Sequence, residues 1–262
     1  MSHNATTTSP LTGTAFGIDI GGSGIKGAPV DLTTGEFAAD RLRIPTPSES
    51  TPTNVAAVVK ELVGSFKLKD DVPIGVTFPA VVQHGVARSA ANVDSSWVGT
   101  NIEAVLSDAV GRPVIAVNDA DAAGYAESVF GAARGSRGVT FMATLGTGIG
   151  SALIVEGILV PNLELGHLEI DGFDAETRAS DAARDREDLS WEEWAVRLQR
   201  YFGVIEDLMW PDLIVVGGGV SKHHEKFLSL LHLRAPIVPA QLRNAAGIVG
   251  AGALAAKAAA SG

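Results

Sequence analysis

Apolar residues occur along this chain either in short unbroken runs or at the spacing of a helix. An unbroken apolar run bounded by turn residues is typical of a buried strand. Such runs predict strands at 15–20, 25–30, 74–78, 114–117, 139–145, 151–155 and 213–216. Helices are predicted at 54–66, with Thr53 or Asn54 as the cap, and at 120–130, 189–209 and, in an Ala- and Gly-rich run, 245–260. The order of strand, turn, strand and helix therefore occurs twice and predicts two α/β halves.

Each half carries a glycine-rich turn after its first strand. The first turn contains Gly21, Gly22, Ser23 and Gly24, and the second contains Gly146, Thr147 and Gly148. Backbone N–H groups in such turns converge on phosphate oxygens, and glycine lets the chain approach them without a Cβ clash. One turn alone fits an ordinary hairpin equally well. Two turns with an Asn-Asp pair between them predict that two lobes hold a phosphate chain beside an acceptor hydroxyl, as in a phosphotransferase.

Carboxylates at predicted strand ends are the candidates for proton transfer and for metal binding. A carboxylate can orient an attacking hydroxyl and accept its proton during phosphoryl transfer, so we expect Asp119 to be the general base and Asn118 to hold a neighbouring hydroxyl. Without other context, such a pair more often forms an Asx turn or a helix cap. Asp19 lies where a carboxylate organises Mg²⁺ through its waters, or caps a turn. Lys26 either contacts a phosphate or flanks the hairpin.

Composition narrows the classes of partner. The 262 residues are 46% hydrophobic, which is ample for one large or two modest cores. The formal charge of −10 argues against nucleic-acid and membrane partners, and no apolar run approaches the roughly 20 residues of a membrane span. Residues 1–14 are polar and lack signal-peptide features, so we expect a disordered lead. The absence of cysteine excludes disulfides and favours the cytoplasm.

The order of five motifs resembles the ROK family of sugar kinases and sugar-responsive repressors. The motifs are Asp-Ile-Gly-Gly-Ser-Gly-Ile-Lys (19–26), Asn-Asp-Ala-Asp (118–121), Leu-Gly-Thr-Gly-Ile-Gly (145–150), Glu-Leu-Gly-His (164–167) and Val-Val-Gly-Gly-Gly-Val (215–220). Within that family, the segments at 22–27, 91–101, 164–169 and 210–213 are similar to the polyphosphate glucokinases. The resemblance extends from about Phe16 to the C-terminus.

This resemblance implies a fold and an activity. The expected fold is the two-domain α/β actin-like ATPase fold of sugar kinases and Hsp70, with an inter-domain cleft. The expected domains are 15–130 and 131–262, with the helix at 245–260 packing back on the first, and the family implies a homodimer. The implied reaction transfers a phosphoryl group from inorganic polyphosphate or ATP to the 6-hydroxyl of glucose, and possible use of mannose stays open. A strictly ATP-dependent hexokinase of the same family is the alternative.

The family motifs also imply which residues bind the sugar. The implied set is Asn92, Asn118, Asp119, Glu164 and His167, completed by either Glu176 or Glu169, between which spacing does not decide. Many family members follow the Glu-x-Gly-His motif with a cysteine-rich zinc site. The segment 168–190 contains no cysteine here, so we expect no zinc and assign His167 to a sugar hydroxyl.

The end of the phosphate donor that is remote from the transferred phosphoryl group is expected beside a third glycine turn. Gly217, Gly218 and Gly219 lie where ATP-using relatives place the adenosine. Cationic residues follow this turn, and a long polyanion needs several spaced cations, so we expect a polyphosphate strip there. The strip would contain Lys222, His223, His224 and Lys226, with Arg134 and Arg137 on the same rim. A solvated surface helix is the alternative.

Three other classes fit the sequence less well. A sugar-sensing repressor needs a helix-turn-helix, for which residues 1–14 are too few. A dinucleotide-binding oxidoreductase needs a strand, turn and helix around its glycines, whereas the turn at 21–24 opens a predicted hairpin. A chaperone-like ATPase of the broader fold would need a longer chain and a substrate domain.

Overall fold

The computed structural model of the chain describes residues 11–90 and 93–261. Two compact units are present: unit 1 contains Met1–Ala126 and Ala245–Gly262, and unit 2 contains Glu127–Asn244. The sequence predicts the boundary at 130/131, and the division between these units falls inside helix α3 (Asp119–Phe130), which is continuous through that point. Most of the predicted lead at 1–14 lies outside the described residues.

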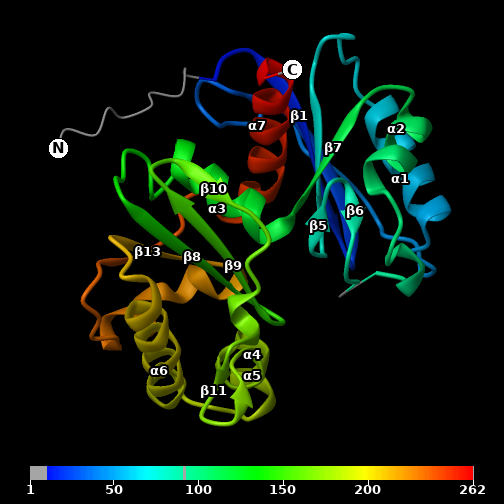
Figure 1. The fold of residues 1–262 in the computed structure, drawn as a ribbon. Coiled ribbons are helices and arrows are strands. Elements are labelled where there is room, and N and C mark those ends of the chain that lie inside the picture. Colours follow the sequence, from blue (N-terminus) through cyan, green and yellow to red (C-terminus); the bar gives the residue numbers. More distant parts are fainter. Residues whose placement is uncertain (1–10, 91–92, 262) are drawn as a thin grey trace. The chain divides into compact units, whose positions relative to one another are not determined.

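A five-stranded mixed sheet forms the centre of unit 1 (Figure 1). Its strands are β1 (Thr14–Gly21), β2 (Gly24–Asp31), β3 (Leu42–Ile44), β4 (Ile74–Phe78) and β7 (Val114–Asn118), in the order β3-β2-β1-β4-β7. β2 runs antiparallel to β1 and β3, whereas β1, β4 and β7 are parallel. The carboxyl ends of the three parallel strands therefore share one edge of the sheet. A short hairpin, β5 (Val82–Gln83) and β6 (Val86–Ala87), follows β4.

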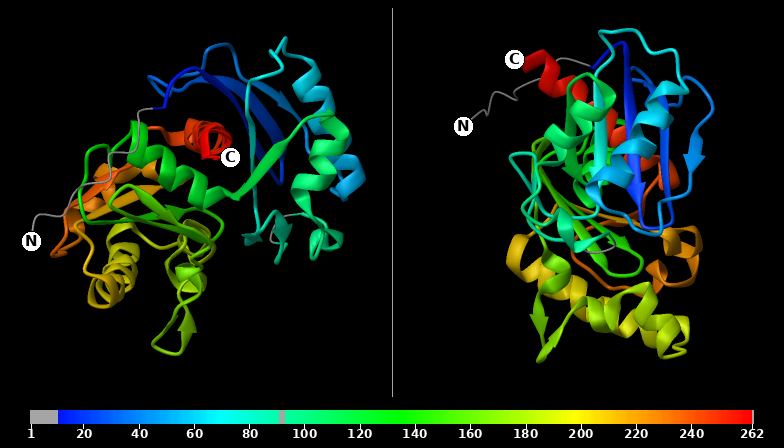
Figure 2. Two further views of the ribbon diagram at one scale, coloured as in Figure 1. Left: turned by 45° about the horizontal axis from the view of Figure 1, so that its top comes forward. Right: turned by 90° about the vertical axis from the view of Figure 1, so that its right-hand side faces the viewer.

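Two helices cover one face of this sheet and α7 (Ala246–Ser261) covers the other, as the left view of Figure 2 shows. The two helices that share one face are α1 (Pro52–Gly64) and α2 (Ile102–Val110). Thr51 caps α1 and Pro52 occupies its first position, so our predicted start at 54 was wrong. Pro is tolerated there because the first N–H groups of a helix have no intrahelical partner. Phe16, Trp97 and neighbouring aliphatic residues form the core beneath these helices.

Close contact between α7 and the sheet depends on glycine. A Cβ on Gly17 of β1 would collide with the carbonyl oxygen of Ile248, and one on Gly75 of β4 would collide with that of Ala251. Without these side chains, the helix backbone lies directly on the strands and buries Ile248 and Val249 completely. Helix α7 therefore belongs to unit 1 and contributes its buried residues to the core of that unit.

Unit 2 repeats the sheet topology of unit 1. Its strands are β8 (Val139–Leu145), β9 (Ile149–Val155), β10 (Ile158–Val160), β13 (Leu213–Gly217) and β14 (Ile237–Pro239), in the order β10-β9-β8-β13-β14. β9 is antiparallel to β8 and β10, and β8, β13 and β14 are parallel. Each sheet thus places a glycine turn between its first two strands, and the predicted repeat is present.

The remaining elements of unit 2 follow β10. They are β11 (Glu169–Ile170), β12 (Phe173–Asp174), α4 (Glu176–Ala179), α5 (Asp181–Arg186) and α6 (Trp191–Met209). Ser190 and Glu193 form a capping box that starts α6, two residues after the predicted start. Buried Trp194 packs with Phe141 and Val216 in the core of unit 2. Among the described residues, the 3₁₀ helices are η1 (Ser95–Trp97), η2 (Leu165–His167), η3 (Gly219–Lys226), η4 (Leu228–Leu230) and η5 (Arg243–Ala245). Within the described ranges, no helix has the length and apolar character needed to cross a membrane.

Candidate active site

The carboxylate of Asp19 is held at the carboxyl end of β1 by its neighbours on both sides. Thr77 on β4 donates from Oγ1 to Oδ1 at 3.0 Å, and Lys26 on β2 donates from Nζ to Oδ2 at 3.1 Å. The side chain of Asp19 is 25% exposed, so solvent reaches it. An oriented, partly open oxygen donor fits a hydrated Mg²⁺, which prefers oxygen ligands and retains much of its water. The structure also pairs Lys26 with this carboxylate.

The first glycine turn carries an arginine that sequence reasoning missed. Gly21 pairs with Gly24, which leaves Gly22 and Ser23 as a two-residue hairpin loop. Arg43 on β3 donates from Nη2 to the carbonyl oxygen of Ser23 at 2.6 Å, and its guanidinium lies against Gly24. Arg43 is also the cross-strand partner of Lys26. The turn is therefore accompanied by two cations, whose proximity only the pairing of β2 with β3 reveals.

Asn118 and Asp119 stand where β7 ends and α3 begins. Oδ1 of Asn118 accepts hydrogen bonds from the N–H groups of Ala120 at 2.8 Å and Asp121 at 3.1 Å, which is helix capping. Nδ2 donates to the carbonyl oxygen of Ala80 at 3.0 Å. Asp119 is exposed in the first turn of α3, a position that favours a negative side chain. The capped helix start thus presents a carboxylate to solvent. Asn92 lies outside the described residues.

The second glycine turn is held by the segment that starts α4 and α5. Gly146, Thr147 and Gly148 connect β8 to β9. The N–H of Ala182 donates to the carbonyl oxygen of Gly146 at 3.0 Å, and the N–H of Ile149 donates to Oε2 of Glu176 at 3.0 Å. A Cβ on Gly148 would collide with the same carboxylate. Glu176 is therefore attached to the turn directly.

Four polar side chains meet beside this turn. Nδ1 of His167 lies 2.8 Å from Oδ2 of Asp174 and 4.0 Å from Oε1 of Glu176, and Nε2 lies 4.0 Å from Oε2 of Glu164. Glu169 is exposed on β11 and is absent from these contacts. Of the two carboxylates between which spacing could not decide, the structure thus brings Glu176 to His167. Sequence reasoning missed Asp174, whose place depends on the β11–β12 hairpin.

The charges in this cluster shift two titrations. The hydrogen bond with Asp174 raises the pKa of His167, and the negative charges of Glu176, Asp174 and Glu164 add to this effect, while partial burial opposes it. Burial raises the pKa of Glu164, to which Glu176 adds, and the charge of His167 lowers it. His167 therefore keeps its proton to higher pH than an isolated histidine.

The same cluster tests the expectation that zinc is absent. Ligand atoms of His167, Asp174 and Glu176 lie within 4.8 Å of one another, close enough to hold a cation. A structural zinc site usually has four ligands, mostly sulfur and nitrogen, whereas this set offers one imidazole and two carboxylates, and Glu176 already accepts from Ile149. We expect elemental analysis of dialysed protein to find no stoichiometric zinc. One equivalent per chain would contradict this assignment.

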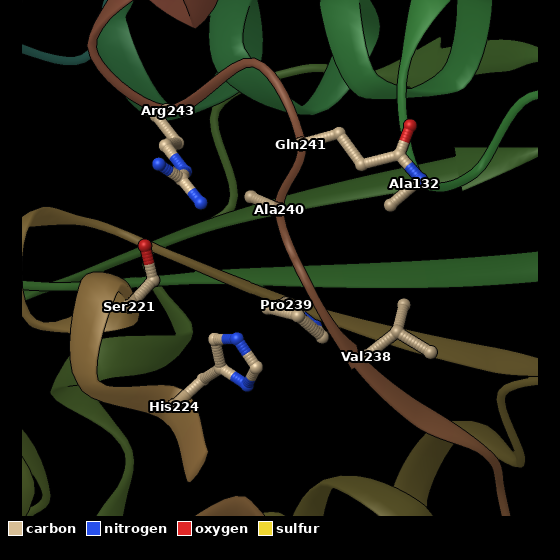
Figure 3. Close-up of a pocket in the computed structure, with 8 residues that line it drawn as sticks. All are labelled: Ala132, Ser221, His224, Val238, Pro239, Ala240, Gln241 and Arg243. Carbon is tan, nitrogen blue, oxygen red and sulfur yellow. The ribbon is translucent and has the colours of Figure 1, made fainter.

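A cavity of about 440 Å³ lies beyond the carboxyl ends of β13 and β14 (Figure 3). Its lining consists of Ala132, Ser221, His224, Val238, Pro239, Ala240, Gln241 and Arg243. In the close-up, His224 and Arg243 extend toward this cavity from different segments. Ser221 donates from Oγ to the carbonyl oxygen of Gly218 at 2.8 Å, which ties the cavity wall to the third glycine turn.

The residues of the predicted basic strip after this turn make different contacts in the structure. His224 lines the cavity, but His223 and Lys226 pack against Trp191, with Nζ of Lys226 5.4 Å from the ring centroid. Lys222 is exposed and is absent from the cavity lining. The backbone of η3 departs from helical geometry at His223, where the segment is kinked. Arg134 and Arg137 are exposed, and neither belongs to the lining.

A buried carboxylate organises two walls of the cavity. Oε2 of Glu127 accepts from the N–H groups of Ala132 at 2.7 Å and Gln241 at 3.1 Å, and Oε1 accepts from that of Leu242 at 2.7 Å. Glu127 is 1% exposed, and Ala132 and Gln241 both line the cavity. Gln241 and Leu242 are more than a hundred positions from Glu127, so periodicity gave no signal for this role.

Comparison with known proteins identifies the family to which the chain belongs. A family model described as the ROK family matches residues 15–179, and the chain belongs to that family. The predicted resemblance and the actin-like ATPase fold of its sugar kinases are thereby confirmed.

The particular relatives are sugar kinases. A polyphosphate glucokinase of Mycobacterium tuberculosis (strain CDC 1551 / Oshkosh) is 49% identical over 237 residues, 90% of this chain and 89% of the relative. The inorganic polyphosphate/ATP-glucomannokinase of Arthrobacter sp. strain KM is 54% identical with a TM-score of 0.87, covering 94% of this chain and 100% of that one. A ROK family glucokinase of Streptomyces griseus, solved with glucose and AMPPNP, shares the fold at 24% identity and a TM-score of 0.77, covering 94% and 100%.

Proposed function

We propose that this chain transfers a phosphoryl group from inorganic polyphosphate or ATP to the 6-hydroxyl of glucose, and that mannose is a second candidate acceptor. About half of its residues are identical to those of polyphosphate-using kinases over nearly its whole length, which supports the reaction class. The observation that carries the proposal is Asp119, an exposed carboxylate at a capped helix start, in a chain whose two sheets each bear a glycine turn.

Each group in the proposed mechanism has a separate task. Asp119 orients the 6-hydroxyl and accepts its proton as the hydroxyl oxygen attacks the terminal phosphorus, and the shortened donor leaves with the bridging oxygen. The N–H groups of the turns at 21–24 and 146–148 hold donor phosphates. Asn118, Glu164, His167 and Glu176, together with Asn92, orient the sugar hydroxyls. Asn118 caps α3 and retains a second amide hydrogen for this contact.

The proposal includes a divalent metal ion, Mg²⁺. Asp19 would hold it through metal-bound water, since Thr77 orients the carboxylate and its oxygens are partly exposed. When bound, the cation would neutralise charge on the donor phosphates. Lys26 contributes a second positive charge beside the first turn, and Arg43 accompanies it there.

The proposal includes a homodimer in the cytoplasm, which rests on family analogy and on the absence of cysteine. It includes no nucleic-acid or membrane partner, in keeping with the formal charge of −10.

One assay tests the reaction and its specificity together. Formation of hexose 6-phosphate is measured with glucose, mannose, fructose and N-acetylglucosamine, each with ATP and with polyphosphate. We expect glucose to be phosphorylated with both donors. Activity with ATP alone would favour the ordinary ATP-dependent hexokinase, and sugar-independent donor hydrolysis would contradict the kinase.

The cavity beyond β13 and β14 gives a prediction about the donor. The cavity is lined by the cationic side chain of Arg243 and by His224, whose ring N–H can donate a hydrogen bond, and this pair suits a polyanion better than an adenine base. Replacing His224 with Ala and Arg243 with Gln should therefore raise the KM for polyphosphate more than that for ATP. Each lost phosphate contact also reduces salt dependence, by analogy with nucleic-acid backbones, so the polyphosphate KM should rise less steeply with salt in the variant. Lys60→Ala is the control because Lys60 is an exposed cation on α1 of unit 1. Equal losses for both donors would refute a polyphosphate role of the cavity.

A further inference from the structure

The carboxylate of Asp174 contacts two residues assigned to the sugar, His167 through its ring and Glu176 through its backbone N–H. Its Oδ2 lies 2.8 Å from Nδ1 of His167, and its Oδ1 accepts from the backbone N–H of Glu176 at 3.2 Å. Its own position is fixed by cross-strand pairing with Glu169 and by Oγ1 of Thr177, which donates to its carbonyl oxygen at 2.6 Å. The β11–β12 hairpin therefore delivers one carboxylate to both residues.

We propose that Asp174 is a positioning residue for sugar binding, which fixes the His167 ring through Nδ1 and the start of α4 through the N–H of Glu176. Nε2 of His167 and the carboxylate of Glu176 are thereby presented together to one sugar. This inference rests on the proposed function and adds a residue to its sugar site.

The chemistry of the imidazole explains why Nδ1 is the point that must be fixed. An ionised carboxylate only accepts hydrogen bonds, so Nδ1 carries a hydrogen and Nε2 is left for a ligand. Nε2 lies 4.0 Å from Oε2 of Glu164, beyond hydrogen-bond range. A sugar hydroxyl placed between them would bond to both. Loss of Asp174 would free the ring to rotate and to change tautomer.

Stabilisation of the fold is a weak explanation for the pairing of His167 with Asp174. The side chains of His167 and Asp174 are 54% and 40% exposed, and exposed ion pairs add little to stability. The larger consequence of this hydrogen bond is that it orients the His167 ring. Glu176 does not replace Asp174, because its Oε1 is 4.0 Å from Nδ1 and its Oε2 accepts from Ile149. Hydrogen bonds thus run from His167 through Asp174 to the backbone of Glu176, whose side chain holds the second glycine turn.

The test replaces Asp174 with Asn and with Glu. An amide has a single acceptor oxygen, so its NH₂ group would face one of the two N–H groups that the carboxylate satisfies. We expect Asp174→Asn to raise the KM for glucose about tenfold, the effect of losing a charge-assisted hydrogen bond, with kcat and the donor KM within about twofold of wild type. Asp174→Glu keeps both acceptors and should recover part of the loss.

Asp171 supplies a matched control from the same hairpin. It is exposed and bonds Arg200 through both carboxylate oxygens, at 2.8 and 2.9 Å, away from His167. Asp171→Asn should leave the glucose KM unchanged. Coincident thermal unfolding of the variants would show that the hairpin is folded in each.

Two further readouts separate positioning from a structural role. The hydrogen bond with Asp174 raises the pKa of His167, so the NMR titration of His167 should move to lower pH in Asp174→Asn, even though the charges of Glu164 and Glu176 remain. Combining Asp174→Asn with His167→Ala should add little to the KM increase of His167→Ala alone.

Several results would overturn the inference: an unchanged glucose KM, an unmoved His167 titration, fully additive variants, or stoichiometric metal on His167. If wild-type protein phosphorylates no sugar, the proposed function fails. Calorimetric measurement of glucose binding and the NMR titration of His167, each compared between the wild-type protein and Asp174→Asn, then test the role of Asp174 independently of catalysis.

Discussion

Asp119→Asn lowers kcat by a factor on the order of 10²–10⁴ and leaves glucose binding close to that of the wild type. The amide keeps the size of the side chain and loses the proton acceptor. The fold should tolerate the change because Asp119 is exposed and Asn118, which supplies the helix cap, is unchanged. Steady-state kinetics with saturating donor give kcat, and calorimetry with glucose alone gives the binding constant.

Asp108→Asn is the control for this experiment, since Asp108 is an exposed carboxylate on α2 of the same unit. It should retain the wild-type rate. An Asp119→Asn enzyme with more than about half of the wild-type kcat would exclude Asp119 as a general base of the usual effectiveness.

Glu127→Gln should destabilise unit 2 and weaken donor binding. The carboxylate accepts three backbone hydrogen bonds in a fully buried position, and the amide cannot accept all three. A buried N–H without a partner costs about 1–3 kcal/mol, so we expect the free energy of unfolding to fall by about that amount for each N–H that loses its acceptor. The loops of Ala132 and Gln241 would loosen, which should raise the donor KM more than the glucose KM.

Urea denaturation at neutral pH measures the loss, and Glu156→Gln is the matched control. Glu156 is exposed and accepts a single backbone hydrogen bond, from Gly138 at 3.1 Å. Its replacement should change the unfolding midpoint little. Equal midpoints for the Glu127→Gln and wild-type proteins would show that the buried carboxylate is dispensable.

Sequence pattern was a good guide to the long, buried elements. The strand at 74–78 has the predicted bounds, and the helix predicted at 189–209 begins two residues later, at its capping box. Helix α2 was missed because it has nine residues and buries only Ile102 and Leu106. Its caps, Asn101 and Gly111, were available signals. The three-residue strands β3 and β14 form through pairing with distant strands and have little local signal.

Motif order predicted the glycine turns and the residues 118–119, 164 and 167, whose roles stay predictions. Residues that act through distant partners were not predicted. Arg43 meets a carbonyl 20 positions earlier, and Glu127 accepts from an N–H 114 positions later. The strip at 222–226 stays a prediction, and within it His224 lines the cavity whereas His223 and Lys226 pack against Trp191.

The packing of α7 on the first sheet determines the order in which the molecule can be completed during synthesis. Gly17 and Gly75 leave open the space that the helix fills, so unit 1 lacks part of its core until the residues after 245 have been made. Unit 2 is one continuous segment, 127–244, and all of it is synthesised before α7. Because domains generally fold as units on the ribosome, the later half of the chain reaches a complete core before the earlier half does. Until α7 arrives, apolar strands of unit 1 remain exposed to aggregation or chaperone binding.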